Sequence, residues 1–217
     1  MSFHYELIYF SSHGRGEQIR LLLTLAGQPF TERQFERSRW PELKKDMPLG
    51  QLPVLVERTA AGERTIPQSQ AILRHLARRY GLYGQNDTDM LQADIVADTV
   101  VDVGTSMHPM LYGSTKGNPE VIRKYFHETW PVHARRLESL LPHSSSPSGG
   151  LFVCASPTFA DVAAFQALHT LLALHPHCLD QHPSLQRFYD VVAAVPALVP
   201  YLKVRRENEA LALRPAA

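Results

Sequence analysis

The spacing of hydrophobic residues changes once along this chain, near residue 81. Before that point, short apolar runs typical of strands alternate with segments at helical spacing. Beyond it, the apolar residues recur at helical spacing throughout. The pattern predicts strands at residues 5–10, 29–35, 54–57 and a fourth ending at 66, and helices at 17–26 and 68–80. The chain therefore divides into a mixed α/β part and an all-helical part.

The first six elements follow the order strand, helix, strand, strand, strand, helix. This is the order of a thioredoxin-like domain. We expect that domain at residues 1–80, followed by a turn-rich linker at 81–87. Residues 40–45, between the second and third strands, are short and charged and favour an irregular helix or turn.

Residues 88–217 are expected to form an all-α domain. Its predicted helices cover residues 89–114, 118–141, 158–174, 183–193 and 196–204. Pro109 falls inside the first helix and should kink it, because proline removes an intrahelical hydrogen bond. Thr158 and Asp161 have the spacing of a capping box, and the nearly all-apolar helix after them should be central. Residues 144–150 are expected to be a flexible loop, and the C-terminal tail is expected to fray.

Two segments of the first domain predict a binding site. Residues 50–56 join a proline to an apolar run, and proline suits a strand start because its missing N–H breaks no ladder there. Leu52 is then expected to offer an unpaired N–H and C=O at a sheet edge, where an extended peptide can add. Gln68 and Ser69 open a helix, whose free N–H groups favour a carboxylate. Together the segments predict a receptor for a small anionic peptide.

Composition and charge narrow the functional classes. The 217 residues are 44% hydrophobic and 20% charged, with a formal net charge of +1. This balance is ordinary for a globular protein and too weak to attract nucleic acid or a membrane surface. No apolar run is long enough to span a bilayer, and the N-terminus lacks the basic start of a signal peptide. Cys154 and Cys178 match no metal or redox spacing, which favours a reducing cytosol, with a disulfide between them as the open alternative.

Several short motifs share one order and spacing. They are Tyr9-Phe10 with Gly14-Arg15-Gly16, Trp40 with Lys44, residues 50–53, Gln68-Ser69 with residues 71–76, residues 81–84, Asp94 with Asp98 and Asp102, residues 159–161 and residues 178–180. Taken together they resemble the cytosolic glutathione transferases of the tyrosine type, with the pi and sigma classes most similar. The resemblance spans nearly the whole chain. It implies a thioredoxin-like N-terminal domain, an all-helical C-terminal domain, a cytoplasmic homodimer and a cis peptide bond before Pro53.

Tyr9 is the catalytic residue that the resemblance implies, with Arg15 as its electrostatic support. Tyr9 ends the first predicted strand, and ligands lie at strand ends in α/β sheets. A phenol O–H that donates to the glutathione sulfur favours the thiolate, because a hydrogen bond to the charged form stabilises it. From position alone, Tyr9 is an ordinary core tyrosine and Arg15 a surface charge at a helix start.

Glutathione, the implied co-substrate, carries two carboxylates and one ammonium group. The residues implied to bind it are Trp40 and Lys44 at the glycyl carboxylate, Gln51, Leu52 and Pro53 at the cysteinyl backbone, Gln68 and Ser69 at the γ-glutamyl carboxylate, and Asp102, from the neighbouring subunit, at the ammonium. Lys45 is the alternative to Lys44, and Asp98 the alternative to Asp102. The plainer reading is helix capping for Gln68 and Ser69 and solvated surface charges for Lys44, Asp98 and Asp102.

Phe10, Ser12, His108 and Tyr112 are the candidate walls of a pocket for the electrophile. His108 and Tyr112 lie at i and i+4 and so share a helix face, although both are alternatively ordinary residues of that helix. Tyr112 falls where pi-class enzymes place a tyrosine that assists the electrophile, whereas His108 replaces an apolar residue and implies a more polar pocket. Leu49 stands where an aromatic residue often contacts the partner subunit, so a flatter or more polar dimer interface is expected.

The sequence therefore predicts a glutathione transferase that conjugates the glutathione thiolate to small hydrophobic electrophiles, as in detoxification, without a metal. One alternative is a glutathione-dependent isomerase or peroxidase that uses the same site. The other is a non-catalytic relative that binds hydrophobic ligands, because a fold does not fix a function. Neither nucleic acid nor a membrane is expected as a partner.

Overall fold

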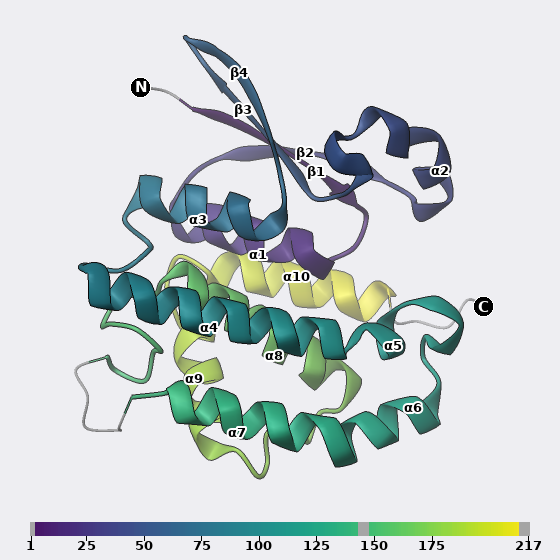
Figure 1. Ribbon diagram of the computed structural model, residues 1–217, viewed down its shortest axis with the longest axis vertical. Coiled ribbons are helices and arrows are strands. Elements are labelled where there is room, and N and C mark those ends of the chain that lie inside the picture. Colours follow the sequence, from purple (N-terminus) through teal and green to yellow (C-terminus); the bar gives the residue numbers. More distant parts are fainter. Residues whose placement is uncertain (1–2, 143–147, 213–217) are drawn as a thin grey trace. The chain divides into compact units, whose positions relative to one another are not determined.

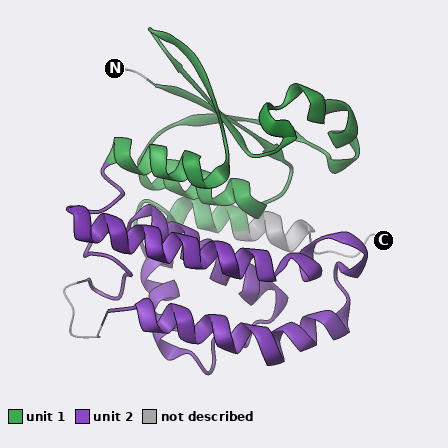
Figure 2. Cartoon of the chain, in the orientation of Figure 1, with its two compact units in different colours: residues 1–80, 196–217 green, residues 81–195 purple. Residues whose placement is uncertain are grey.

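The computed structural model describes residues 3–142 and 148–212, with side chains as far as Arg205. These residues form two compact units (Figure 2), one of residues 1–80 with 196–217 and the other of residues 81–195. The predicted helical domain includes residues 196–217, whereas the contacts of this segment join it to the N-terminal unit.

The N-terminal unit is built on a four-stranded sheet in the order β2-β1-β3-β4. Its elements are β1 (His4–Phe10), α1 (Gly14–Leu25), β2 (Phe30–Phe35), α2 (Trp40–Leu43), β3 (Val54–Thr59), β4 (Gly62–Pro67), α3 (Ser69–Tyr80) and α10 (Val199–Ala212), with 3₁₀ turns at Arg37–Arg39, Lys44–Asp46 and Pro48–Gly50. β1 pairs parallel with β2 and antiparallel with β3, which pairs antiparallel with β4. The thioredoxin-like order predicted from the sequence is confirmed.

Alternate residues of β1 face opposite sides of the sheet, as the pleat requires. Tyr5 meets α3 through a hydrogen bond of 2.7 Å between its hydroxyl and that of Tyr80, and α1 and α3 pack side by side (Figure 1). On the opposite face Ile8 packs with Val54 and Val56. Both faces of the strand that carries Tyr9 are therefore covered.

Leu52 precedes β3 and lies outside the ladder, whose register begins at Val54, paired with Ile8 of β1 and Pro67 of β4. Its side chain packs against the cluster of Ile8, Val54 and Val56. The expectation that its backbone N–H and C=O accept an added peptide stays a prediction.

The second unit is all-helical. Its elements are α4 (Asp87–Ser106), α5 (His108–Leu111), a 3₁₀ turn (Gly113–Thr115), α6 (Pro119–Lys124), a π-helical turn (Tyr125–Thr129), α7 (Trp130–Leu140), α8 (Phe159–Leu174) and α9 (Pro183–Ala193). α8 packs against α4 and α9, and nearly all of its residues are buried, which confirms its predicted central place. The capping box is present, because Asp161 Oδ2 accepts hydrogen bonds from Thr158 N at 2.8 Å and Thr158 Oγ1 at 2.7 Å.

The predicted long helix over residues 89–114 is wrong. α4 ends at Ser106, and a separate short helix, α5, begins at His108. Pro109 lies in the first turn of α5, where a missing N–H breaks no intrahelical bond, so the proline belongs to a new start rather than to a kink. Tyr112, just past α5, has an extended backbone.

The predicted helix over residues 118–141 begins as expected, because Asn118 caps it by accepting hydrogen bonds from the backbone N–H groups of Glu120 and Val121. The π-helical turn then interrupts its regular spacing before α7. Of the predicted loop at 144–150, residues 144–147 lie outside the described residues, as does the tail at 213–217.

Cys154 and Cys178 are both free thiols, so the disulfide alternative is excluded. Burial raises the pKa of the Cys178 thiol to about 12. Cys178 is therefore protonated at neutral pH and a poor nucleophile.

Candidate functional site

Tyr9 is held by a turn of the backbone that approaches its ring closely. Its side chain is 4% exposed, and the backbone N–H of Arg15 donates a hydrogen bond of 3.0 Å to its hydroxyl oxygen. A Cβ added at Gly14 would lie 2.5 Å from Tyr9 Oη, and one added at Gly16 would lie 2.5 Å from Cδ1. Only glycine lets the chain pass this close to the phenol. The N–H donor at Oη also polarises the phenol, which makes its O–H a stronger hydrogen-bond donor.

Arg15 meets Tyr9 through its backbone amide, while its residue as a whole is exposed. Arg20, which the sequence analysis did not single out, is buried with its guanidinium carbon 5.9 Å from the centre of the Tyr9 ring. The signal that marks it in the sequence is a pair of opposite charges, Glu17 and Arg20, three residues apart in a helix that is mostly apolar from Ile19 onward.

Aromatic residues and one buried hydroxyl follow Tyr9. Phe10 packs edge-on against Trp40, with ring centres 5.4 Å apart, and the Arg37 guanidinium lies 4.7 Å from the Phe10 ring centre. Arg37 is not among the site residues predicted from the sequence. Ser12 Oγ is buried and makes no hydrogen bond to any described residue.

The segment from Lys44 to Ser69 brings together most of the predicted glutathione-binding residues of this unit. The exposed Lys44 lies against Gly50, because a Cβ there would be 3.3 Å from Lys44 Cε. Gln68 Nε2 donates a hydrogen bond of 3.1 Å to Gln51 Oε1. The exposed Lys45 remains an alternative to Lys44.

Gln68 has a φ of 73°, a region that residues other than glycine rarely occupy. Such strain is concentrated at functional sites. α3 begins at Ser69, one residue later than predicted, and Ser69 is buried at its start. The peptide bond between Leu52 and Pro53 is cis, as the resemblance implies.

The other candidate residues belong to the helical unit and lie near its surface. Asp98 and Asp102 are both exposed on α4. Burial and Arg136 lower the pKa of the neighbouring His133, and Asp102 opposes this shift. The rings of His108 and Tyr112 meet edge-on with centres 5.4 Å apart, so they are neighbours as predicted, although they do not share one continuous helix.

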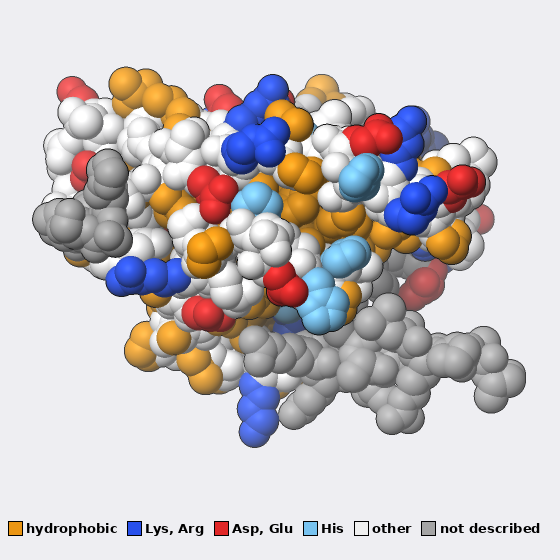
Figure 3. Space-filling view, turned by 90° about the horizontal axis from the view of Figure 1, so that it is seen from below, with side chains coloured by type: hydrophobic (Ala, Val, Ile, Leu, Met, Phe, Trp, Pro, Cys, Tyr) orange, Lys and Arg blue, Asp and Glu red, His pale blue; other side chains and the backbone are white. Residues whose placement is uncertain are grey.

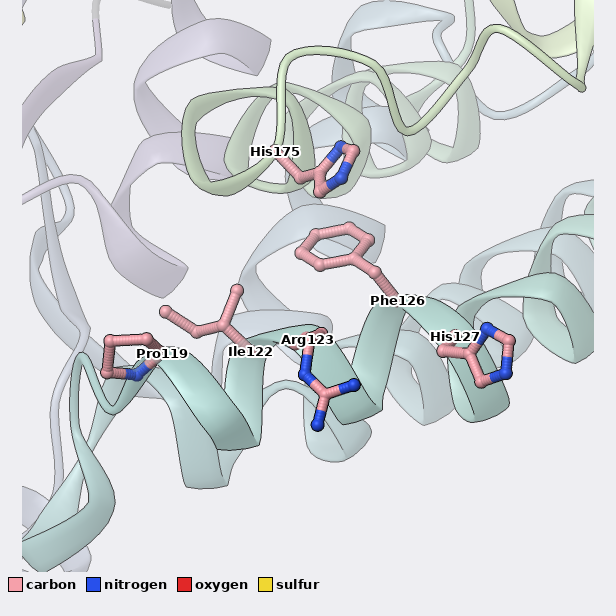
Figure 4. Close-up of a pocket in the computed structure, with 6 residues that line it drawn as sticks. All are labelled: Pro119, Ile122, Arg123, Phe126, His127 and His175. Carbon is pink, nitrogen blue, oxygen red and sulfur yellow. The ribbon is translucent and has the colours of Figure 1, made fainter.

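A pocket of about 470 Å³ lies between the α6 segment and the end of α8 (Figure 4). Its lining residues are Pro119, Ile122, Arg123, Phe126, His127 and His175. The His175 ring faces Phe126, with ring centres 4.7 Å apart. The lining contains none of the residues predicted to contact glutathione or the electrophile.

Within residues 3–142 and 148–212, no group of His, Cys, Asp and Glu side chains is arranged to hold a metal ion. No helix in these ranges is both long and apolar enough to cross a bilayer. Acidic and basic side chains are interspersed on the face drawn in Figure 3, in keeping with the small net charge.

The sequence is similar to known protein families in both halves. The family described as "Glutathione S-transferase, N-terminal domain" matches residues 5–78, and "Glutathione S-transferase, C-terminal domain" matches residues 101–205. Glutathione S-transferase P of Caenorhabditis elegans is 32% identical, with 92% of each chain covered. S-crystallin SL11 of Nototodarus sloanii is 29% identical, with 94% of this chain and 98% of that protein covered.

Solved structures agree with these relatives. The Pi-class glutathione S-transferase of Onchocerca volvulus has a TM-score of 0.83 and 31% identity, covering 94% of this chain and 95% of the other. The sigma-class enzyme of Fasciola hepatica has a TM-score of 0.83 and 28% identity, covering 94% and 97%. With both halves matched in order and relatives above 30% identity over nearly the full length, this chain belongs to the glutathione S-transferase family, with relatives in its pi and sigma classes.

Proposed function

We propose that this protein conjugates the glutathione thiolate to small hydrophobic electrophiles and that Tyr9 stabilises the thiolate. The observation that carries the proposal is the hydrogen bond from Arg15 N to Tyr9 Oη, at a buried phenol against which Gly14 and Gly16 pack. Because Oη acts as the acceptor of the Arg15 amide, we assign the phenol O–H the role of donor to the glutathione sulfur. Stabilising the thiolate raises its concentration at neutral pH, where a free thiol is mostly protonated.

Glutathione itself is proposed to bind along the segment that ends in α3. Gln51 and Leu52, with Pro53, would hold the cysteinyl backbone, and Gln68 and Ser69 the γ-glutamyl carboxylate. Support comes from the hydrogen bond between Gln51 and Gln68 and from the strained backbone of Gln68. The start of α3 adds free N–H groups that suit an anion. Trp40 and Lys44 are the proposed donors to the glycyl carboxylate.

Four residues are proposed to select the electrophile: Phe10 and Ser12 of the N-terminal unit and His108 and Tyr112 of the helical unit. The unpartnered Ser12 hydroxyl and the contact between His108 and Tyr112 support this assignment. Both features are polar, which favours electrophiles with a hydrogen-bonding group.

We propose that the protein is a cytoplasmic homodimer. In it, Asp102 of one subunit binds the ammonium group of the glutathione held by the other subunit. α4 carries Asp102 and exposes Leu91 and Ile95 to 62% and 41%, and such apolar groups are commonly covered in an oligomer. Leu49, 68% exposed, is a further candidate contact. Sedimentation analysis tests this: a monomer at micromolar concentration contradicts it.

The central test measures the ultraviolet absorbance of the thiolate of bound glutathione against pH. The wild type should show a thiol pKa below that of free glutathione, and Tyr9→Phe should lose the shift and most of the conjugating activity. Tyr5→Phe is the matched control, because Tyr5 is a buried tyrosine of the same strand whose hydroxyl bonds to Tyr80. If Tyr9→Phe retains full activity, the role given to Tyr9 is wrong.

A non-catalytic binding protein is the second candidate. One similar protein, S-crystallin SL11, bears a name that is not that of a transferase, so family membership does not by itself establish turnover. This candidate predicts glutathione binding with an unshifted thiol pKa and no product. Product analysis also identifies an isomerase, because isomerisation consumes no glutathione.

A further inference from the structure

A buried carboxylate, that of Glu17 in α1, directly follows the glycines that approach Tyr9. Glu17 is 0% exposed and Arg20 is 4% exposed, and the two form an ion pair of 3.0 Å. Buried charges of this kind must be paired and hydrogen-bonded, because an isolated one is strongly destabilising. Each partner of Glu17 therefore has a defined position.

Two of those partners come from α10. Tyr201 donates a hydrogen bond of 2.7 Å to Glu17 Oε1, and Arg205 Nη1 lies 3.2 Å from the same oxygen. Burial and the Glu17 carboxylate raise the pKa of Tyr201, so its hydroxyl stays protonated and donates. α10 belongs to the same compact unit as Tyr9, so this contact is internal to the unit.

Arg20 connects this carboxylate to the turn beside Tyr9. Its Nη1 donates to the carbonyl oxygens of Ser12 at 3.1 Å and His13 at 3.5 Å, and its Nε donates to Glu32 Oε2 at 2.9 Å. Ser12 and His13 directly precede Gly14 and Arg15, whose amide binds the Tyr9 hydroxyl. A continuous set of polar contacts therefore runs from α10 through α1 to Tyr9 Oη.

We infer that Tyr201 of α10 is a positioning residue for Tyr9: through Glu17 and Arg20 it fixes the turn that aims the Arg15 amide at the Tyr9 hydroxyl. This inference rests on the proposed function for its catalytic meaning. If the turn relaxes, the amide hydrogen bond lengthens, the phenol becomes a weaker donor, and the glutathione thiolate is less stabilised. Arg205 supports the same oxygen of Glu17 from the next turn of α10.

Tyr201→Phe tests the inference with the loss of a single hydroxyl, whereas Glu17→Gln or Arg20→Lys could prevent folding. Tyr125→Phe is the matched control, because Tyr125 is a buried tyrosine of the helical unit whose hydroxyl lies 3.1 Å from Ser106 Oγ. Both variants should lose similar stability. Only Tyr201→Phe should raise the thiol pKa of bound glutathione, by about half a unit, which lowers the thiolate fraction about threefold below that pKa.

A second readout needs no glutathione. The Arg15 amide proton, followed by nuclear magnetic resonance, should change its chemical shift and exchange faster with solvent in Tyr201→Phe but not in Tyr125→Phe. An unchanged Arg15 amide in folded Tyr201→Phe overturns the inference, as does an unchanged thiol pKa where the wild type lowers it. If the wild type itself does not lower the thiol pKa, the proposed function fails, and the amide measurement alone still decides whether Tyr201 positions the turn.

Discussion

The protein holds Tyr9, proposed to stabilise the thiolate, and Tyr112, proposed to contact the electrophile, in different ways. Tyr9 is 4% exposed, packed against two glycines and bonded to a backbone amide, whereas Tyr112 is 37% exposed beyond the end of a four-residue helix. The first is fixed by packing and by buried charges. The second can change with little effect on the rest of the unit. This contrast suits a transferase that keeps one thiol substrate and varies the other.

The largest effect on activity is expected at Gly16, which packs against the buried Tyr9 ring. Gly16→Ala places a Cβ against the Tyr9 ring and should displace it, and a misplacement of about 1 Å lowers kcat/KM about a hundredfold. Gly104→Ala is the control, because no atom lies within 4 Å of a Cβ added there and alanine is the better helix former. Steady-state kinetics and urea unfolding of both variants provide the measurement. Equal kinetics in the two variants would show that the Tyr9 turn is not tightly packed.

Two acidic residues, Glu57 and Asp102, show the same contrast between a buried and an exposed position. Glu57 is buried and accepts hydrogen bonds from Arg79 and His75, so Glu57→Gln should lower the free energy of unfolding by about 2 kcal/mol. Asp102 is exposed, and Asp102→Asn should change that free energy by less than about 0.5 kcal/mol while raising the KM for glutathione. Urea titration and kinetics measure the two effects. An Asp102 variant that is strongly destabilised would contradict its placement among exposed residues.

Acid should lower the stability of the folded protein mainly through the buried carboxyl group of Glu57. Burial opposes ionisation of Glu57, but hydrogen bonds from Arg79 and His75 prevail and lower its pKa below 4.5. A carboxyl with a lowered pKa stabilises the folded state above its unfolded pKa, and that contribution is lost as the pH falls through the folded value. Urea midpoints measured from about pH 6 to about pH 3 should therefore fall less steeply in Glu57→Gln than in the wild type. Parallel curves would mean that Glu57 carries no such contribution.

The smallest and most substrate-dependent effects are expected at His108 and Tyr112. His108→Leu should favour more apolar electrophiles, with changes in kcat/KM below about tenfold, or about 1.4 kcal/mol. Tyr112→Phe should affect only electrophiles that accept a hydrogen bond. A panel of electrophiles assayed against both variants measures this. A uniform loss across the panel would place these residues in the common chemistry rather than in substrate selection.

Local sequence patterns predicted much of the fold because they report local physics. Short apolar runs marked the strands, and the Thr158–Asp161 spacing marked the start of α8, where the capping hydrogen bonds are found. The split between α4 and α5 was missed because Pro109 suits a helix start as well as a kink, and periodicity does not distinguish the two.

The candidate site was predictable only in part for a related reason. Tyr9, Gln51 and Gln68 stand in recognisable motifs, but the roles assigned to them remain predictions. Tyr201 is inferred to act through a partner far away in the chain, since Tyr201 and Glu17 are separated by 184 positions. No local pattern reports such a pair, and the grouping of residues 196–217 with the first 80 was missed for the same reason.

That grouping has a consequence for synthesis on the ribosome. Residues 1–80 are made before Tyr201 and Arg205, which donate to and pair with Glu17. At about 5–20 residues per second, residues 1–80 wait on the order of 10 s for these partners, with the Glu17 carboxylate only partly paired. A nascent chain arrested before residue 196 should therefore expose Glu17 to solvent and be sensitive to protease at α1, until α10 arrives to complete the unit.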